Sequence, residues 1–202
     1  MNRSLIVAAK ARDEETINRL LKEGADPNTH DNLSLHLPIW KKVFQEFLHK
    51  QLDANADGAT ALELVFSEDQ ATSKQAIIQN VEPVGIVRTL LAHGAHADIN
   101  DAAGEPLIIQ PISLGYSRCV DLMLANGSNA NARIHGVVPV LVIAVGNKDA
   151  EMVKILLEKG ADPNVSFGDG YPVDAYAEMN ELHEIASLLK GAKKYSTNRG
   201  IR

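Results

Sequence analysis

The chain has 202 residues, of which 45% are hydrophobic and 23% charged, and its formal net charge is −6. This composition supports a sizeable core, and no apolar run approaches the ~18 residues that a membrane-spanning helix requires. The stretch from Gly191 to Arg202 holds four basic residues and no acid, so the remaining body carries 16 basic and 26 acidic side chains. An acidic body repels phosphate backbones, which argues against nucleic acid as the main partner.

The N-terminal segment from Met1 to Ala9 contains a short apolar stretch. Lys10, Arg12 and Asp13 interrupt this stretch at once, so we expect no secretory signal. The single cysteine, Cys119, cannot form an internal disulfide, which fits a reducing compartment. We therefore expect a cytoplasmic protein that does not act at a membrane and is monomeric when free.

A phrase of leucines, then glycine, then a small or acidic run ending in Asn or Asp recurs along the chain. It occupies residues 20–28, 90–98, 123–131 and 156–164. Gly94, Gly127 and Gly160 are each 33 residues apart, while Gly24 and Gly94 are 70 apart. Apolar residues between the phrases follow helical spacing. Each unit is therefore predicted to contain two short antiparallel helices, with a glycine in the left-handed conformation at the end of the second.

The phrases Gly-Ala-Asp-Pro-Asn at 160–164 and Glu-Met-Val-Lys-Ile-Leu-Leu-Glu-Lys-Gly at 151–160 resemble ankyrin repeats, whose period is about 33 residues. The resemblance implies an all-α ankyrin-repeat solenoid of about six helix-turn-helix units with projecting turns, forming one domain over residues 1–192. The typical Thr-Pro-Leu-His opening of the first helix is nowhere intact, and Thr60-Ala61-Leu62-Glu63 is its nearest version. The units are expected near 1–29, 30–56, 57–99, 100–132, 133–165 and 166–192, followed by a basic flexible tail at 193–202.

Two places depart from the repeat. Residues 67–84 exceed the usual turn between helices by about 13 residues, and we expect a surface loop there, with contact to a partner as the alternative. Residues 38–47, in the second unit, include the only tryptophan, Trp40. Its aromatic neighbours are expected to fill space between shortened helices, and the alternative is that Trp40 is an exposed anchor for a partner.

No motif indicates a metal site or catalysis. Residues 53–58 match the first half of a calcium-binding loop, but position 12 of that loop would be Leu64 instead of a bidentate glutamate. His93, His96 and Asp98 lack a third inward ligand, and Cys119 has no base indicated nearby. We therefore expect no metal, no cofactor and no catalytic residue, and we predict that the protein is not an enzyme.

The resemblance implies protein–protein recognition, because ankyrin arrays present their turn tips and the inner faces of their first helices as a concave surface. The net acidity of the body predicts a partner protein with a basic patch. Alternatives are a dedicated inhibitor that blocks a partner enzyme and a metal-dependent module. The aromatic side chains of Phe167 and Tyr171 flank one tip and are the expected hot spot. The predicted contact residues at the tips are His30, Asp31, Asp57, Asp101, Arg133, His135, Phe167, Asp169 and Tyr171, and those at the inner helix ends are Tyr116, Asn147 and Met179.

Overall fold

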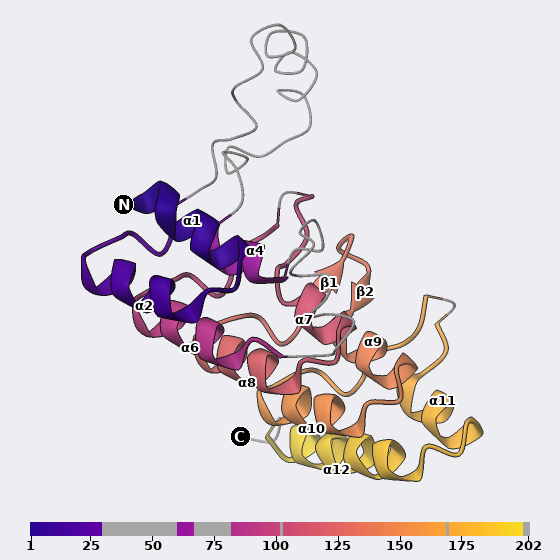
Figure 1. Ribbon diagram of the computed structural model, residues 1–202. Helices are drawn as coiled ribbons and strands as arrows, with labels where there is room; N and C mark the ends of the chain where they lie inside the picture. The colour runs from indigo at the N-terminus through magenta and orange to yellow at the C-terminus, as the bar shows by residue number, and fades with distance from the viewer. Residues whose placement is uncertain (30–59, 67–81, 102, 169, 200–202) are drawn as a thin grey trace, which may run out of the picture. The chain divides into compact units, whose positions relative to one another are not determined.

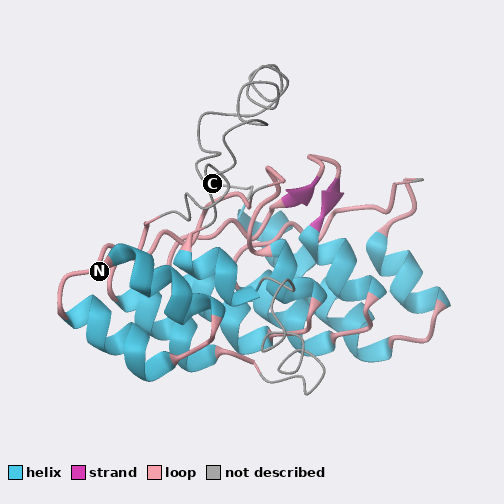
Figure 2. Ribbon diagram, turned by 45° about the horizontal axis from the view of Figure 1, so that its top comes forward, coloured by secondary structure: helices cyan, strands magenta, loops and turns pink. Residues whose placement is uncertain are grey.

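The computed structural model describes residues 1–29, 60–66, 82–101, 103–168 and 170–199 (Figure 1). These residues form two compact units, Met1–Glu105 and Pro106–Arg202. Nearly all of their regular structure is helical, as Figure 2 shows, which confirms the predicted all-α class. Among the described helices none is long and apolar enough to cross a membrane. The single domain predicted over residues 1–192 stays a prediction.

The unit Met1–Glu105 contains two helix pairs. Helix α1 packs on α4 and helix α2 packs on α6, so that each helix of the first pair lies beside its counterpart in the second (Figure 1). Leu5, Ile17, Leu62 and Leu90 come from these four helices and are all fully buried between them. The helices are α1 (Asn2–Lys10), α2 (Glu14–Lys22), α4 (Ala61–Phe66) and α6 (Val84–Ala92).

A side-chain bridge shows that these two pairs are direct neighbours. The Asn28 Nδ2 donates to the carbonyl oxygen of Gly94 at 3.0 Å, and the Asn28 Oδ1 accepts from the backbone N–H of His96 at 2.8 Å. In the other unit, Asn131 makes the same two bonds, to Gly160 and Asp162, at 3.1 and 2.8 Å. No repeat therefore lies between α1–α2 and α4–α6.

This direct stacking leaves no place in the stack for the repeat predicted at residues 30–56. The described helices make five pairs, so the predicted count of six units is not confirmed. Residues 30–59 and 67–81, which include Trp40, most of the 67–84 insertion and the calcium-like sequence at 53–58, lie outside the described residues.

The unit Pro106–Arg202 contains three helix pairs and one short hairpin. We call the first helix of each pair the inner helix and the second the outer helix. The inner helices pack in the order α7, α9, α11 and the outer helices in the order α8, α10, α12 (Figure 1). The elements are α7 (Ile109–Ser113), α8 (Ser117–Ala125), β1 (Arg133–Ile134), β2 (Val138–Pro139), α9 (Val140–Gly146), α10 (Ala150–Glu158), α11 (Val173–Met179) and α12 (His183–Arg199).

Glycines end the outer helices α2, α6, α8 and α10, as the sequence predicted. Gly24, Gly94, Gly127 and Gly160 have φ values of 91°, 87°, 101° and 93°. After α10, the Gly160 N–H donates to the Leu157 carbonyl at 3.1 Å, and the following N–H of Ala161 donates to the Leu156 carbonyl at 2.9 Å. These two bonds make a Schellman motif, which satisfies the last carbonyl groups of the helix and reverses the chain.

The last outer helix, α12, does not stop at a glycine. It passes through Gly191, which lacks a positive φ, and continues to Arg199. The prediction of a flexible tail from residue 193 is therefore wrong for residues 193–199. Lys193 belongs to the helix, and its Nζ lies 2.6 Å from the Asp174 Oδ2 on α11.

The two kinds of glycine are expected to respond oppositely to alanine. Gly160→Ala places a Cβ on a left-handed residue and should cost about 1 kcal/mol of unfolding free energy, although the space around it is open. Gly191→Ala should add about 0.5 to 1 kcal/mol, because its position is helical and equally open. Urea titrations of both variants check this; a destabilising Gly191→Ala would mean that α12 ends before Gly191.

A candidate protein-binding surface

The hairpin β1–β2 projects from the end of its repeat as a short finger (Figure 2). His135 and Gly136 have positive φ values of 49° and 69°, the pattern of a type I′ turn, and the Val137 N–H closes the turn onto the Ile134 carbonyl at 2.9 Å. The Arg133 Nη1 donates to the Val137 carbonyl at 2.9 Å. Arg133 and His135 are exposed, as predicted for contact residues, and both also shape the finger.

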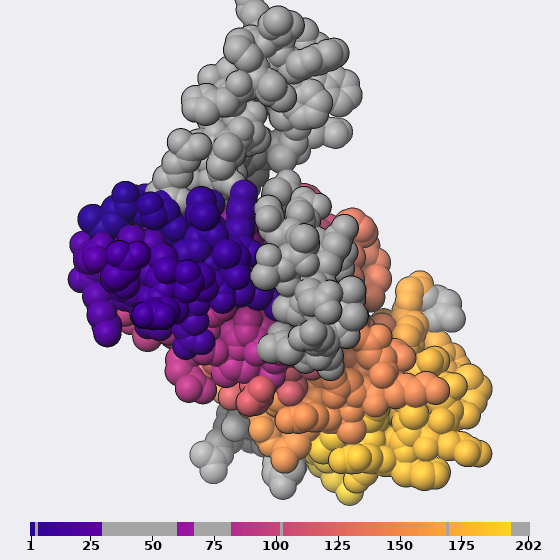
Figure 3. Space-filling view, in the orientation of Figure 1, coloured from indigo at the N-terminus to yellow at the C-terminus, as the bar shows by residue number. Residues whose placement is uncertain are grey.

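A second finger precedes α11. Ser166 and Pro172 form an antiparallel bridge, and the Phe167 N–H donates to the Tyr171 carbonyl at 2.9 Å. The Gly170 N–H donates to the Phe167 carbonyl at 2.8 Å, and Gly170 has a φ of 82°. In the space-filling view this finger stands out from the body of its unit (Figure 3). Its two aromatic residues therefore flank the turn, as the sequence predicted.

These aromatic residues join α11 in one apolar strip. The Phe167 and Tyr176 rings have centroids 4.5 Å apart at an interplanar angle of 42°. The Tyr171 hydroxyl donates to the Met179 Sδ at 3.7 Å. Tyr176 and Met179 are three residues apart on α11 and are therefore neighbours on its surface. We call Phe167, Tyr171, Tyr176 and Met179 the apolar strip.

Much of the apolar strip is open to solvent. Met179 is 68% exposed and Tyr171 is 38% exposed, while Phe167 and Tyr176 are half-buried. The residues one and two periods before Met179 are Gly146 and Ser113, which end the inner helices α9 and α7. Because small residues suffice at this position of the repeat, packing does not require a methionine there.

The charges beside the strip are paired within the chain. Lys193 hydrogen-bonds to Asp174, and this bond holds the pKa of the Asp174 carboxyl below its usual value, against the opposing effect of burial. Lys190 lies 2.6 Å from Glu178, and the bond between them raises the pKa of the Lys190 amine. The strip is thus an apolar surface next to two internally neutralised acids.

Tyr116 corrects the prediction for the inner helix ends. It was expected to contact a partner, but its side chain is only 2% exposed. Tyr116 is the N-cap residue of α8 instead of an end of the inner helix, so its ring turns into the core of the repeat. Its hydroxyl is buried with no hydrogen-bond partner among the described residues.

Removal of this hydroxyl is expected to be harmless. A buried hydroxyl without a partner costs about 1 to 3 kcal/mol of desolvation, so Tyr116→Phe should leave the melting temperature unchanged or raise it. Differential scanning calorimetry measures the change. A loss of stability near 1 kcal/mol would show that the hydroxyl has a hydrogen-bond partner in solution, such as a buried water.

The other predicted contact residues are dispersed. His30, Asp31, Asp57 and Asp169 lie outside the described residues. The Asp101 Oδ1 accepts from the N–H groups of Ala103 and Glu105 at 2.9 and 3.0 Å, so this carboxylate forms a turn. Asn147 is exposed at the end of α9. Of the twelve predicted residues, the structure brings Phe167, Tyr171 and Met179 together.

The sequence analysis missed two residues of this surface. Tyr176 was overlooked, although its position three residues before Met179 on a predicted helix puts both on one face. Val137, which is 64% exposed on the first finger, was also overlooked. Its signal was an apolar residue directly after the turn residues His135 and Gly136, where a solvated turn would tolerate a polar one.

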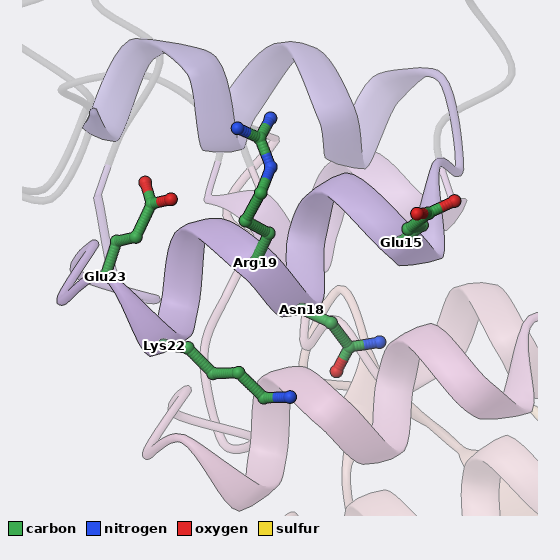
Figure 4. Close-up of a pocket in the computed structure, with 5 residues that line it drawn as sticks. All are labelled: Glu15, Asn18, Arg19, Lys22 and Glu23. Atoms are coloured by element: carbon green, nitrogen blue, oxygen red, sulfur yellow. The ribbon is translucent and has the colours of Figure 1, made fainter.

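No other part of the described surface gathers groups for chemistry. A shallow hollow over α2 is lined by five polar residues from that helix and its C-cap (Figure 4). Figure 4 shows Arg19 and Lys22 pointing in different directions, so these groups do not converge on one ligand. No cluster of three or more His, Cys, Asp or Glu among the described residues could hold a metal. Cys119 is buried.

Comparison with known proteins decides the family. Residues 73–167 match the family model for ankyrin repeats in three copies. The chain is an ankyrin-repeat protein. Ankyrin repeats generally mediate protein–protein interactions and typically have no catalytic activity. No curated protein matches this ankyrin chain in a sequence comparison.

Proposed function

We propose that this ankyrin-repeat protein binds a partner protein through its finger tips and inner helix ends, the surface that is concave in ankyrin arrays, with the apolar strip as the main anchor. The observation that carries the proposal is the 68% exposure of Met179, in contact with Tyr171, at a position where the preceding repeats have glycine and serine. Exposed aromatic and methionine side chains are enriched at interfaces, and burying them on binding releases free energy.

The partner is proposed to carry a basic patch that faces the first unit. Residues 1–105 contain 10 basic and 16 acidic side chains, while residues 106–202 contain 10 of each. The acidic excess therefore lies in the first unit, and the strip lies on the electrically balanced second unit. Opposite charge speeds encounter more than it strengthens the final complex, so the association rate should fall as salt rises.

A matched pair of baits tests the proposal. The wild-type protein, a Tyr171→Ser/Met179→Ser variant and a Lys154→Ala variant are used to capture proteins from a cytoplasmic extract, since the protein is proposed to act there as a free monomer. Lys154 is an exposed residue of the outer helix α10 and serves as the control. A partner retained by the wild type and the control but lost by the strip variant supports the proposal. Capture that is equal with all three baits contradicts it.

An assay of the captured partner separates two forms of this function. If the partner is an enzyme whose activity falls in stoichiometric proportion to added protein, the ankyrin array is a dedicated inhibitor. If its activity is unchanged, the array is an adaptor. Both forms use the same surface, so the bait experiment is valid for either.

A further inference from the structure

The outer helix of the last repeat differs from all other described outer helices. Helices α2, α6, α8 and α10 each have nine residues, whereas α12 has 17. The four shorter helices end at a glycine with positive φ, and α12 continues past Gly191 without one. The last repeat therefore has an extension of its outer helix that no other described repeat has.

This extension is tied to both ends of α11. The Lys193 Nζ lies 2.6 Å from the Asp174 Oδ2, in the first turn of α11, and the Lys190 Nζ lies 2.6 Å from the Glu178 Oε1, in its last turn. Asp174 at the helix N-terminus is favoured by the helix dipole, whereas Glu178 near the C-terminus is disfavoured and gains from a cation beside it. The two pairs thus fix the rotation of a helix that has only seven residues.

Helix α11 has fewer neighbours of its own kind than the other inner helices of its unit. Helix α9 packs between α7 and α11, but no described inner helix covers the far side of α11. Asp174 and Glu178, four residues apart, face α12, while Tyr176 and Met179 carry the apolar strip. A change in the rotation of α11 would therefore displace the strip.

We propose that the extension of α12 is a clamp that holds α11 in the orientation that presents the apolar strip, with Lys193 and Lys190 as positioning residues. The effect of this clamp on binding rests on the proposed function above. Its effect on the orientation of α11 does not, so the two can be tested separately.

Methionine methyl resonances of the full chain provide the test. The chain has four methionines; Met123 and Met152 are fully buried, and the Met179 Sδ accepts a hydrogen bond from Tyr171, so its methyl group senses that ring. Lys193→Gln and Lys190→Gln/Lys193→Gln are expected to shift the Met179 resonance while leaving those of Met123 and Met152 in place. The control is Lys194→Gln, which removes an exposed charge from the same helix.

Hydrogen exchange of the α11 amides gives the size of the effect. Loss of one partly buried pair should speed exchange in α11 by about threefold to tenfold and leave α9 unchanged. The exchanged pair Asp174→Lys/Lys193→Asp should restore both the resonance and the protection. An unchanged Met179 resonance and unchanged α11 protection in the Lys190→Gln/Lys193→Gln variant would overturn the proposal. So would an equal effect of Lys194→Gln.

The affinity for the captured partner then links the clamp to binding. The Lys190→Gln/Lys193→Gln variant should bind about threefold to tenfold more weakly, and the exchanged pair should recover the loss. If Tyr171→Ser/Met179→Ser does not affect binding, the proposed function fails while the clamp stands on its resonance and exchange data. If the strip variant abolishes binding but the double lysine variant shows neither effect, the clamp fails and the proposed function stands.

Discussion

Replacing Leu156 by alanine is expected to lower the free energy of unfolding by about 2 to 5 kcal/mol. Leu156 has no exposed surface and lies on α10, which packs against α8, α9 and α12. The substitution removes the buried isobutyl group, and the helices around it are fixed on three sides, so they can fill the cavity only in part. This cost is a large fraction of the 5 to 15 kcal/mol typical of a domain, and the melting temperature should fall sharply.

The neighbouring leucine is a matched control. Leu157 is half-buried on the same helix, and Leu157→Ala should cost clearly less. Neither change removes the Schellman bonds after α10, because Leu156 and Leu157 accept them through backbone carbonyls. Thermal unfolding of both variants gives the comparison. A Leu156→Ala protein that melts like the wild type would mean that α10 is rotated away from the core.

The helix ends could be predicted from the sequence because their causes are local. A positive φ is strained for most residues and free for glycine, so a glycine after a leucine-rich helix specifies its own end. Gly127 and Gly160 needed no information beyond the residues next to them. Gly191 is the informative exception. Like those glycines it follows two leucines and a further outer-helix residue, but the lysines after it bind α11, and those contacts keep the chain helical.

The number of repeats could not be predicted because stacking is not local. A spacing of 70 residues between Gly24 and Gly94 is close to two periods of 33, and the sequence analysis filled it with an atypical unit. The Asn28 bridge to Gly94 and His96 shows instead that two repeats far apart in sequence are neighbours in the stack. Asn at the end of each phrase was visible in the sequence, but its partner across the stack was not.

The candidate surface was predicted in part for a similar reason. Repeat register places a residue near a tip or a helix end, and it did so correctly for Phe167, Tyr171 and Met179. Register alone does not fix which way a side chain turns at the boundary between two helices. Tyr116 follows the inner helix by three residues, and this short step is enough to bury its ring. Predictions at helix termini therefore need the rotation of the following helix.

Alanine at the finger beside α11 is expected to weaken partner binding far more than alanine on the outer helices. Tyr171→Ala and Phe167→Ala should each raise the Kd of the captured partner about 30-fold or more, which corresponds to about 2 kcal/mol. Lys22→Ala and Lys154→Ala, on the outer helices α2 and α10, should change it less than about twofold. The contrast follows from desolvation: burying an exposed ring releases water from a large apolar area, whereas both lysines stay hydrated.

Titration calorimetry on the four variants measures the affinities, with circular dichroism confirming that each is folded. Tyr171→Ala is the cleaner probe, because Phe167 also stacks on Tyr176 and its loss frees that ring to move. If Phe167→Ala weakens binding and Tyr171→Ala does not, the ring pair positions Tyr176 and the contact lies along α11. If both lysine variants lose binding while the two finger variants retain it, the interface lies on the outer helices. The apolar strip would then be an exposed surface without a role in recognition.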